Sequence, residues 1–256
     1  MNFNLYNNEI IKNFKSESQK VRVLTESWVA INIYCPSCGN KIHNYENNKP
    51  VADFYCLKCK EDYELKSKKN KIGKKIVDGA YSTMIERLNS SQNPNFFFLT
   101  YDDVDFNILN FLVIPKHFFT PQIVEKRKPL SSTAKRAGWV GCNILLETIP
   151  NSGKIFYIKN KKIESMNKVL DAWNKMSFLK ENKDIESKSW LLDIIQCIEK
   201  LNKKNFSLSD IYHFEAYLKA KHPKNNNIKA KIRQQLQILR DKRYLNFISR
   251  GSYSLR

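Results

Sequence analysis

The sequence contains 256 residues, with 44 lysines and arginines against 25 aspartates and glutamates, so its formal net charge at pH 7 is +19. A chain of this length can bury a large core, in one domain or in a domain with an appendage, and so much positive charge favours a polyanionic partner such as DNA or RNA. Since no apolar run approaches the roughly 18 residues that span a bilayer and no secretory signal opens the chain, we expect a cytoplasmic protein with no membrane partner.

The first feature in chain order is a pair of helices. The apolar spacing predicts a short helix over residues 3–14 and a second helix over residues 21–29. The second helix places Val23, Leu24 and Trp28 on its inner side. The cysteines and acids that could carry chemistry follow directly.

Four cysteines occur as two short pairs, Cys35-x-x-Cys38 and Cys56-x-x-Cys59, with 17 residues between the pairs. This spacing is typical of a zinc ribbon, in which each pair supplies two thiolates of a tetrahedral Zn²⁺ site. Four unrelated thiols or disulfides are the weaker alternatives, the second because disulfides need an oxidising compartment. Because four thiolates fill the coordination shell and leave no position for water, the zinc is expected to be structural.

Acidic residues flank the second cysteine pair. Residues 51–55 and 62–66 both alternate with period two, which predicts two strands that pair as a hairpin centred on that cysteine pair. This register places Asp53 opposite Asp62 and diagonal to Glu64. Diagonal neighbours on one face of a sheet lie about 7–8 Å apart, so two of these carboxylates can converge on one cation.

A lysine shares the face of the second acid. Glu64 and Lys66 are two residues apart on the predicted strand and therefore point the same way. Two carboxylates and a lysine suit phosphodiester hydrolysis, in which Asp53 and Glu64 hold Mg²⁺ and Lys66 orients the attacking water. The alternative is a solvated strand face whose charges have no chemical role.

The middle of the chain predicts a helix and a set of strands. Apolar residues recur with helical period over residues 76–88, whereas residues 96–101 and 110–114 are short apolar runs typical of buried strands. A further strand and turn are expected over residues 153–162, followed by a helix at about residues 170–176. This order is typical of helices that cover a mixed sheet.

Residues 126–142 form a basic stretch that contains serine and glycine. Glycines on both sides of Trp139 place its indole on a tight loop. Trp139 either fills the core from this loop or makes an apolar contact with a base in a DNA groove. Lys135 and Arg136 beside it are expected to bind phosphates.

Residues 181–188 are polar and mixed in charge, which favours a linker between two domains. Beyond them, three amphipathic helices and a terminal β-hairpin predict a winged helix, whose third helix enters the major groove. Ser207-x-x-Asp210 resembles a capping box at the start of the second helix. A winged helix that binds a protein instead of DNA is the alternative. The third helix carries polar and basic residues suited to DNA, namely Asn227, Lys229, Arg233, Gln234 and Gln237.

Asp53 followed by Glu64-x-Lys66 resembles the motif of the PD-(D/E)xK nuclease superfamily. One departure is that Ala52 stands where the superfamily has its eponymous proline. That proline shapes only the backbone that enters the site, so its replacement leaves the acids and the lysine in place.

A narrower resemblance rests on additional residues. With the four cysteines, the segment Arg136-Ala-Gly-Trp139 and the basic helix at residues 231–242, the chain is similar to the DpnI-like methyl-directed Type II restriction endonucleases. The resemblance covers essentially the whole chain and is most specific over residues 48–68.

This resemblance implies an enzyme that cleaves double-stranded DNA at G-A-T-C sites when the adenine carries an N6-methyl group. Its catalytic residues would be Asp53, Glu64 and Lys66, with the two acids as Mg²⁺ ligands. The resemblance also favours DNA contact for Trp139. An enzyme of this kind would spare unmethylated host DNA in a bacterial restriction system.

The expected fold is α+β with two domains. Residues 1–182 would form a mixed-sheet PD-(D/E)xK endonuclease domain with an inserted zinc ribbon-like site, and residues 183–256 a winged-helix DNA-binding domain. Structural Zn²⁺ and catalytic Mg²⁺ are the expected cofactors, with no small-molecule cofactor. The expected partner is double-stranded DNA methylated on adenine. We expect a monomer. The sequence leaves open whether one active site cuts the two DNA strands in succession or a transient pair of molecules cuts them together.

Two other functions fit the same residues. A zinc-containing winged-helix transcription regulator would bind DNA without cutting it, so Asp53 and Mg²⁺ would be irrelevant to its activity. A structure-selective repair nuclease would share the catalytic core and would cut branched or damaged DNA whatever its adenine methylation.

Overall fold

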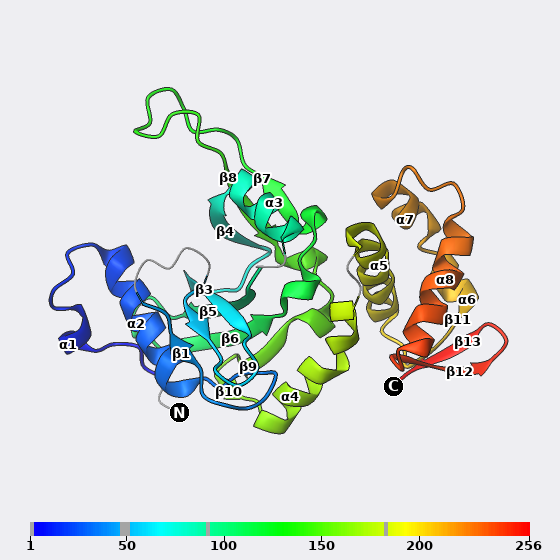
Figure 1. Ribbon diagram of the computed structural model, residues 1–256, viewed down its shortest axis with the longest axis horizontal. Coiled ribbons are helices and arrows are strands. Elements are labelled where there is room, and N and C mark those ends of the chain that lie inside the picture. The colour runs from blue at the N-terminus through cyan, green and yellow to red at the C-terminus, as the bar shows by residue number, and fades with distance from the viewer. Residues whose placement is uncertain (1–2, 47–51, 91–92, 182–183) are drawn as a thin grey trace. The chain divides into compact units, whose positions relative to one another are not determined.

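The computed structural model describes residues 3–46, 52–90, 93–181 and 184–256. The chain divides into two compact units (Figure 1). Unit 1 comprises residues 1–147 and 152–176, and unit 2 comprises residues 148–151 and 177–256. The predicted domain boundary at 182/183 and the first residue of the predicted strand at 51–55 lie outside the described residues. Within the described ranges, no helix is both long and apolar enough to cross a bilayer.

A seven-stranded mixed sheet forms the centre of unit 1. Its order is β1-β2-β3-β5-β6-β9-β10, with β3 parallel to β5 and all other neighbours antiparallel. The predicted strands at 96–101 and 110–114 correspond to β5 and β6. The strands are β1 His43–Asn44, β2 Phe54–Tyr55, β3 Asp62–Lys69, β5 Asn95–Tyr101, β6 Ile108–Ile114, β9 Ile155–Lys159 and β10 Lys162–Ile163.

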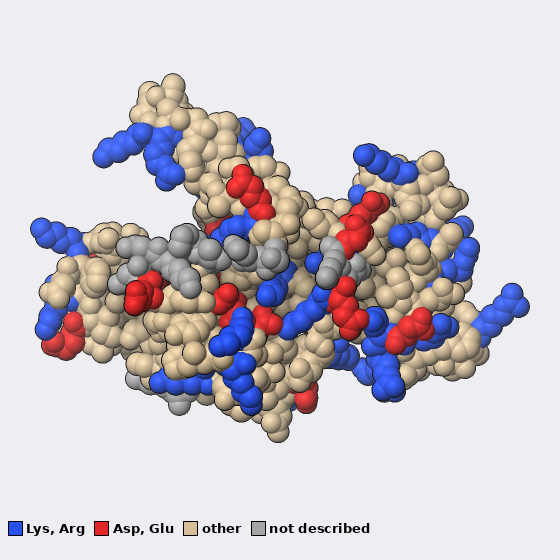
Figure 2. All heavy atoms as spheres, viewed as in Figure 1, with Lys and Arg blue, Asp and Glu red and all other residues tan. Residues whose placement is uncertain are grey.

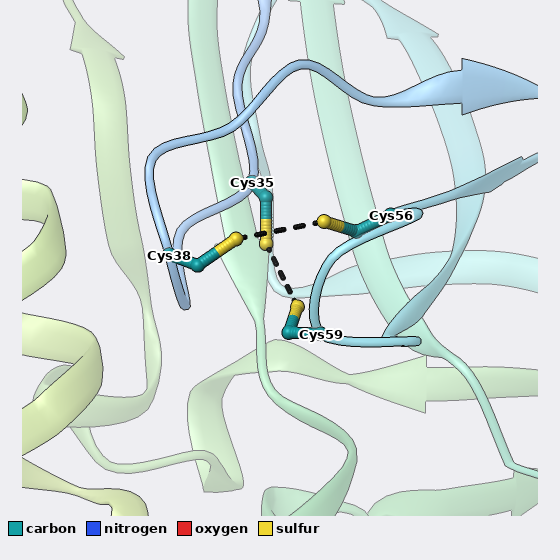
Figure 3. Close-up of side chains that lie close together, drawn as sticks. All are labelled: Cys35, Cys38, Cys56 and Cys59. Carbon is teal, nitrogen blue, oxygen red and sulfur yellow. Dashed lines mark hydrogen bonds between the residues drawn. The ribbon is translucent and has the colours of Figure 1, made fainter.

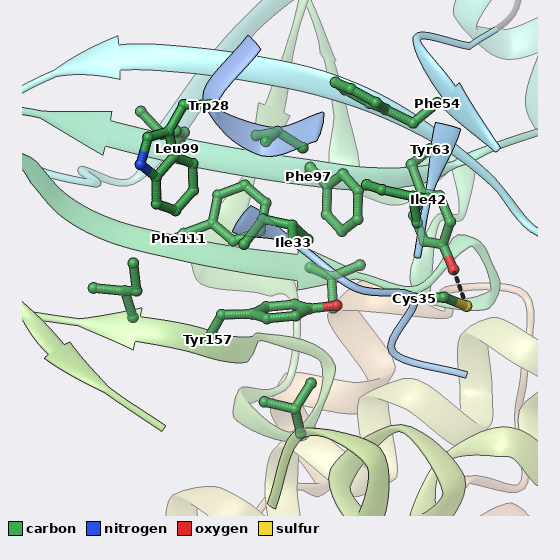
Figure 4. Packing of buried hydrophobic residues seen from close by; sticks show 14 of the residues in the cluster. Trp28, Ile33, Cys35, Ile42, Phe54, Tyr63, Phe97, Leu99, Phe111 and Tyr157 are labelled. Atoms are coloured by element: carbon green, nitrogen blue, oxygen red, sulfur yellow. Dashed lines mark hydrogen bonds between the residues drawn. The ribbon is translucent and has the colours of Figure 1, made fainter. Parts of the chain in front are cut away.

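Helices α2 (Glu17–Asn32) and α4 (Met166–Lys175) contribute to the main core on one face of this sheet. Trp28 of α2 packs edge-on against Phe111 of β6, with 5.9 Å between the ring centroids (Figure 4). Trp173 of α4 belongs to the same cluster. Every residue of β5 is buried, and on its other face Phe96 stacks on Phe119. Burial on both faces explains why the β5 sequence is continuously apolar rather than alternating.

A second, three-stranded antiparallel sheet consists of β4 (Lys75–Ala80), β8 (Gly141–Leu145) and β7 (Val124–Lys126), in that order. The predicted helix at 76–88 is therefore wrong in its first part, because helix α3 starts only at Tyr81 (Tyr81–Asn89). Pairing with β8 holds the preceding segment extended, with Ile76 buried and Val77 exposed as strand alternation requires.

The predicted helix at 3–14 is also shorter than expected, since α1 covers only Asn8–Ile11. The residues before it are held extended against the turn that follows β5. The backbone N–H of Leu5 donates to the carbonyl of Phe106 at 3.0 Å, and the N–H of Ile108 donates to the carbonyl of Phe3 at 2.8 Å. Short 3₁₀ helices complete the connections: η1 Lys116–Phe118, η2 Pro121–Ile123, η3 Leu146–Thr148, η4 Asn151–Gly153 and η5 Ser177–Glu181.

Unit 2 has the element order of a winged helix. Its β11-β13-β12 sheet is antiparallel, and Ile232, Leu236 and Leu239 of the last helix are buried. The mixed sheet, the cysteine cluster and this helical unit confirm the predicted α+β fold class. The elements are α5 Ile185–Leu201, β11 Asn205–Ser207, α6 Leu208–Tyr212, α7 Glu215–Lys221, α8 Ile228–Asp241, β12 Leu245–Ser249 and β13 Ser252–Leu255.

The predicted capping box is present at the start of α6. The Ser207 hydroxyl accepts a bond from the backbone N–H of Asp210 at 3.1 Å, and the Asp210 carboxylate accepts one from the backbone N–H of Ser207 at 2.7 Å. That backbone bond and the Ser207 hydroxyl hold the pKa of Asp210 at about 2, below its ordinary value of 3.8. A carboxylate with a lowered folded-state pKa stabilises the fold above its ordinary pKa and loses that effect as the pH falls.

We predict that Ser207→Ala lowers the local stability of unit 2 by about 1 kcal/mol, because it removes the N-cap acceptor. Asp210→Ala should destabilise the same helix at neutral pH, with a difference from wild type that disappears as the pH falls from 3.8 towards about 2. Amide hydrogen exchange of α6 in the full chain measures both. The exposed Ser209 within α6 provides the control Ser209→Ala, and an equal loss there would contradict the capping assignment.

Candidate active site and metal centre

The four paired cysteines of unit 1 converge on one point (Figure 3). Their Sγ atoms all lie within 4.8 Å of one another, with 3.4 Å between Cys35 and Cys59 and 3.5 Å between Cys38 and Cys56. All four are free thiols. Zinc–sulfur bonds of about 2.3 Å in a tetrahedron separate the sulfurs by about 3.8 Å, so the cluster fits a zinc ion. The four cysteines can thus hold a metal such as zinc.

Two tight turns create the cluster. In the first, the backbone N–H of Gly39 donates to the carbonyl of Cys35 at 2.8 Å, and Gly39 has a φ of +73° that favours glycine. In the second, the N–H of Cys56 donates to the carbonyl of Glu61 at 2.9 Å, and Lys60 adopts a left-handed φ of +58°. Each turn presents two thiols on its inner side, as each half of a tetrahedral site requires.

The electrostatics of the cluster favour a bound cation. Burial raises the pKa of Cys35 well above its usual range, and burial also raises the pKa of Cys59. At Cys38, burial is outweighed by hydrogen bonds from the backbone and side chain of Asn40, and its pKa falls to about 7. Since metal ligands must be thiolates, the charge of the ion itself would offset the cost of ionising the buried sulfurs.

The second turn also sets the register of the acidic hairpin, which differs from the prediction. Tyr55 of β2 pairs with Asp62 of β3 and Phe54 pairs with Tyr63, so Asp53 does not lie opposite Asp62. The backbone N–H of Asp53 donates to the carbonyl of Tyr63 at 2.9 Å, so the regular pairing ends before Glu64. The difference arises because the left-handed Lys60 keeps the chain in the turn as far as Glu61, beyond the last cysteine. Asp53 and Glu64 instead line the same pocket, and Asp62 accepts a hydrogen bond from Tyr45.

Asp53, Glu64 and Lys66 all line one open pocket of about 360 Å³ in unit 1. Helix α2 contributes Arg22 and Glu26 to the same pocket, and these two form an ion pair with 2.6 Å between Nε and Oε1. The pocket is thus built from the acidic hairpin on one side and a helix on the other. The two α2 residues were not predicted to belong to a site, because their charges form an ordinary i,i+4 pair on a helix.

The carboxylates in the pocket affect one another. Burial raises the pKa of Asp53, and the nearby charges of Glu26 and Glu64 raise it further. The backbone N–H of Leu65, which donates to Asp53 at 2.7 Å, and the guanidinium of Arg22 act in the opposite direction. A group of carboxylates that repel one another in a half-buried pocket is the donor set that a hard cation such as Mg²⁺ prefers.

Lys66 is held between two carboxylates. Its Nζ atom lies 2.6 Å from Oε1 of Glu64 and 2.5 Å from Oδ1 of Asp78. Burial lowers the pKa of Lys66, but the two carboxylates outweigh burial and raise it, so the amine remains charged. The other oxygen of Glu64 accepts a bond from Arg87 of α3 at 2.7 Å. Both new partners come from the segment that was predicted as one helix.

Neither Asp78 nor Arg87 was predicted to belong to the site. A helix over residues 76–88 gives no reason to expect Asp78 or Arg87 beside β3. The sequence also contains no regular spacing between these two residues and the motif of Asp53, Glu64 and Lys66. The one available signal was Gly79, since a glycine directly after an aspartate is a common breaker of a helical pattern.

The predicted DNA-contacting residues of unit 1 lie on a long arm, residues 127–140, which joins β7 to β8 and extends from the small sheet (Figure 1). Lys135 and Arg136 are exposed, and lysine and arginine side chains extend from this arm in Figure 2. Trp139 is half-buried at the base of the arm, with the Arg136 guanidinium 4.6 Å from its ring centre. A Cβ atom at Gly141 would lie 2.8 Å from the indole, so this glycine makes room for Trp139. None of the described residues of the arm lines the acidic pocket.

The predicted contacts of unit 2 share one side of α8. Lys229, Arg233, Gln234 and Gln237 are exposed, and Asn227 occupies the N-cap position with an exposed side chain. Two of the basic residues also pack against neighbouring helices. The Arg233 side chain donates to the hydroxyl of Tyr212 at 2.7 Å, and Lys229 lies 3.3 Å from a carboxylate oxygen of Glu215. These contacts orient the two side chains at the surface.

Comparison with protein-family models gives two matches along the chain. Residues 1–182 match the DpnI model, described as the Dam-replacing family. Residues 186–255 match the DpnI_C model, described as the Dam-replacing HTH domain. Together the matches cover both structural units.

We predict one zinc ion per chain at the cysteine cluster, and a Cys56→Ser variant that loses this zinc and unfolds unit 1 at a lower temperature. The reason is that structural zinc contributes its binding free energy to folding. Elemental analysis and thermal unfolding of the full chain measure both effects. Cys142→Ser is the matched control, because Cys142 is buried in the same unit but lies outside the cluster. Equal zinc content in wild type and Cys56→Ser would contradict the assignment.

Proposed function

The chain belongs to the DpnI, or Dam-replacing, family, and from this premise we propose that it is a Type II restriction endonuclease that depends on adenine methylation. Family membership by itself suggests a methylation-dependent restriction-type function. The proposal adds Mg²⁺-dependent hydrolysis of double-stranded DNA at G-A-T-C sites that carry N6-methyladenine. The enzyme would act as a monomer in the cytoplasm, and its cofactors would be a structural zinc ion and a catalytic magnesium ion.

The observation that carries the proposal is that Asp53 and Glu64 line one pocket together with Lys66, which lies 2.6 Å from Glu64. The two carboxylates would hold the magnesium ion, and its charge would offset the burial and the carboxylate repulsion that raise the pKa of Asp53. When bound, Mg²⁺ polarises the scissile phosphate and lowers the pKa of a coordinated water. Lys66 would orient the attacking water and offset negative charge that develops on the phosphate.

The charged state of Lys66 suits this role. The carboxylates beside it keep the amine protonated, so it acts as a hydrogen-bond donor and not as a base. A charged donor in a half-buried pocket interacts with an anionic transition state more strongly than it would in water. The Arg22 guanidinium lines the same pocket and adds a second positive charge near the DNA phosphate.

Two surfaces would bind and read the DNA. On the arm of unit 1, Lys135 and Arg136 would contact phosphates and Trp139 would make an apolar contact with a base. On α8 of unit 2, Arg233 would donate to guanine and Gln234 and Gln237 would bind the N6/N7 edge of adenine, while Asn227 and Lys229 would contact the backbone. A methylated N6 still carries one N–H, so a glutamine can accept that hydrogen bond.

The proposal predicts the outcome of one digest. A plasmid from an adenine-methylating host and the same plasmid in unmethylated form are incubated with the full chain, with Mg²⁺ or with a chelator. Discrete fragments should appear only from methylated DNA with Mg²⁺. Asp53→Ala should abolish them, and Lys66→Ala should slow cleavage by ~10²–10³-fold, as expected for loss of a donor that stabilises transition-state charge.

The other results of this digest favour the rival functions. Cleavage of both plasmids would keep the catalytic site but remove the methyl specificity, and preference for branched substrates would indicate a repair nuclease. DNA binding without cleavage, unchanged in Asp53→Ala, would indicate a transcription regulator.

A second prediction concerns α8. Gln237→Ala should weaken binding to the methylated site by about 1–3 kcal/mol and relax its sequence preference, whereas Lys229→Ala should weaken binding to all sequences and reduce the salt slope by about 1. Fluorescence anisotropy titrations in chelator, over a range of salt concentrations, measure both without cleavage. Equal effects of the two variants on methylated and random DNA would show that α8 does not read bases.

A further inference from the structure

Asp78 brings a buried carboxylate to Lys66 from outside the hairpin that carries the other acids. Lys66 and Glu64 lie on β3 of the main sheet, whereas Asp78 lies on β4 of the small sheet. The Lys66 ammonium lies 2.5 Å from Asp78 and 2.6 Å from Glu64, so it bridges the two sheets. The Asp78 side chain is only 6% exposed, which makes it the more buried of the two carboxylates.

A β-bulge directs Asp78 towards the lysine. Asp78 pairs with Cys142 of β8 and Ala80 pairs with Gly141, so Gly79 is an extra residue in β4. The backbone N–H of Gly79 donates to Oδ1 of Asp78 at 2.8 Å, the same oxygen that contacts Lys66. Bulges bend a strand and re-aim a side chain, and they are common beside active sites. The carboxylate of Asp78 is therefore held in place by the backbone of the bulge residue Gly79.

The other partner of Lys66 has competing contacts. Oε1 of Glu64 contacts Lys66, and Oε2 accepts the bond from Arg87. Under the proposed function, Glu64 must also turn an oxygen to a divalent cation. A lysine anchored only by Glu64 would lose its anchor at that moment, or would compete with the cation for the same carboxylate. Asp78 has no such conflict, since it does not line the acidic pocket.

We propose that Asp78 is a positioning residue for Lys66, which keeps the ammonium in place for reaction while Glu64 engages the cation. Asp78 touches neither the DNA nor the reacting atoms and acts only through Lys66. This inference rests on the proposed nuclease function and extends it. The small sheet would then both carry the arm and position Lys66, because β4, which bears Asp78, pairs with β8 at the base of the arm.

Three variants of the full chain test this role. Asp78→Asn keeps the shape of the side chain and removes its charge, whereas Asp78→Glu keeps the charge and lengthens the side chain by one methylene group. The matched control is Glu125→Gln, because Glu125 of β7 is an ion-paired carboxylate of the same small sheet, 2.5 Å from Lys75, and does not contact Lys66. Thermal unfolding of each variant shows whether the small sheet remains folded.

The kinetic readout separates positioning from binding. For Asp78→Asn we expect kcat on methylated DNA to fall about 10²-fold, the loss that misplacement of a catalytic group by about 1 Å causes. KM and the Kd for DNA in chelator should stay unchanged, because Asp78 is buried and contacts no DNA. Asp78→Glu should restore part of the rate, and Glu125→Gln should cleave as wild type does.

A second readout needs neither metal nor cleavage. In the metal-free protein, the rate at which an amine-reactive acylating reagent modifies Lys66 is followed by mass spectrometry. Asp78→Asn should raise this rate several-fold, because Lys66 then keeps only the anchor of Glu64. The rate at Lys75 should not change in Asp78→Asn and serves as the internal reference.

Unchanged kcat and unchanged Lys66 labelling in Asp78→Asn would overturn the proposal. The proposal would also be overturned if Glu125→Gln lost as much activity as Asp78→Asn. The same holds if the activity loss in Asp78→Asn were explained by a lower unfolding temperature or by weaker DNA binding. If the wild-type protein cleaves no DNA, the proposed function fails, and the labelling of Lys66 still decides whether Asp78 holds the lysine.

Discussion

The acidic pocket depends on one turn, which runs from Cys56 to Glu61 and carries the second pair of thiols. Its left-handed residue, Lys60, lengthens the turn beyond the last cysteine and thereby sets the pairing of β2 with β3. A hairpin whose register shifted by a single residue would turn one acid to the opposite face of the sheet. A metal that holds both thiols of this turn would therefore also hold the strand pairing next to Asp53 and Glu64. The cysteines of the candidate metal site and the acids of the pocket therefore lie in the same short segment.

The same strand connects the pocket to the core. Along β3 the side chains alternate, so Tyr63 points to the buried face while Glu64 and Lys66 point to the pocket. Tyr63 stacks on Phe97 of the central strand, with ring centroids 4.5 Å apart, and its hydroxyl lies 3.1 Å from the sulfur of Cys35 (Figure 4). One side chain thus fixes the cysteine cluster against the aromatic core. The acids on the opposite face are carried by a strand that cannot shift without disturbing that stack.

The small sheet and helix α3 supply charged partners for the residues of the acidic hairpin. Asp78 of β4 and Arg87 of α3 reach the charged residues of β3, and the strand that pairs with β4 ends the arm that carries Arg136 and Trp139. The sheet from which the arm extends therefore also supplies Asp78, the partner of Lys66. The Lys66–Asp78 ion pair between the two sheets is largely buried, so salt screens it less than it would screen an exposed pair.

Much of this protein could be derived from its sequence, because the signals concerned are local. The two cysteine pairs, the alternation of residues 62–66, the apolar strands β5 and β6 and the capping box of Ser207 and Asp210 each depend on residues close together in the chain. Short-range spacing determines which side chains share a face or a turn. The mixed sheet and the winged-helix order followed from the succession of such segments. The family resemblance drew on the same local motifs.

Tertiary structure alone decided the partners of those residues. The spacing of residues 76–88 suits a helix, yet pairing with β8 makes its first part a strand, since strand formation depends on neighbours distant in sequence. That change brought Asp78 to Lys66, and the turn with the left-handed Lys60 set the pairing of β2 with β3 beside the pocket that Asp53 and Glu64 line. Local sequence therefore specified the chemical groups of the pocket. Their convergence required strand register and a bulge, which are set by hydrogen bonds between segments that the sequence places far apart.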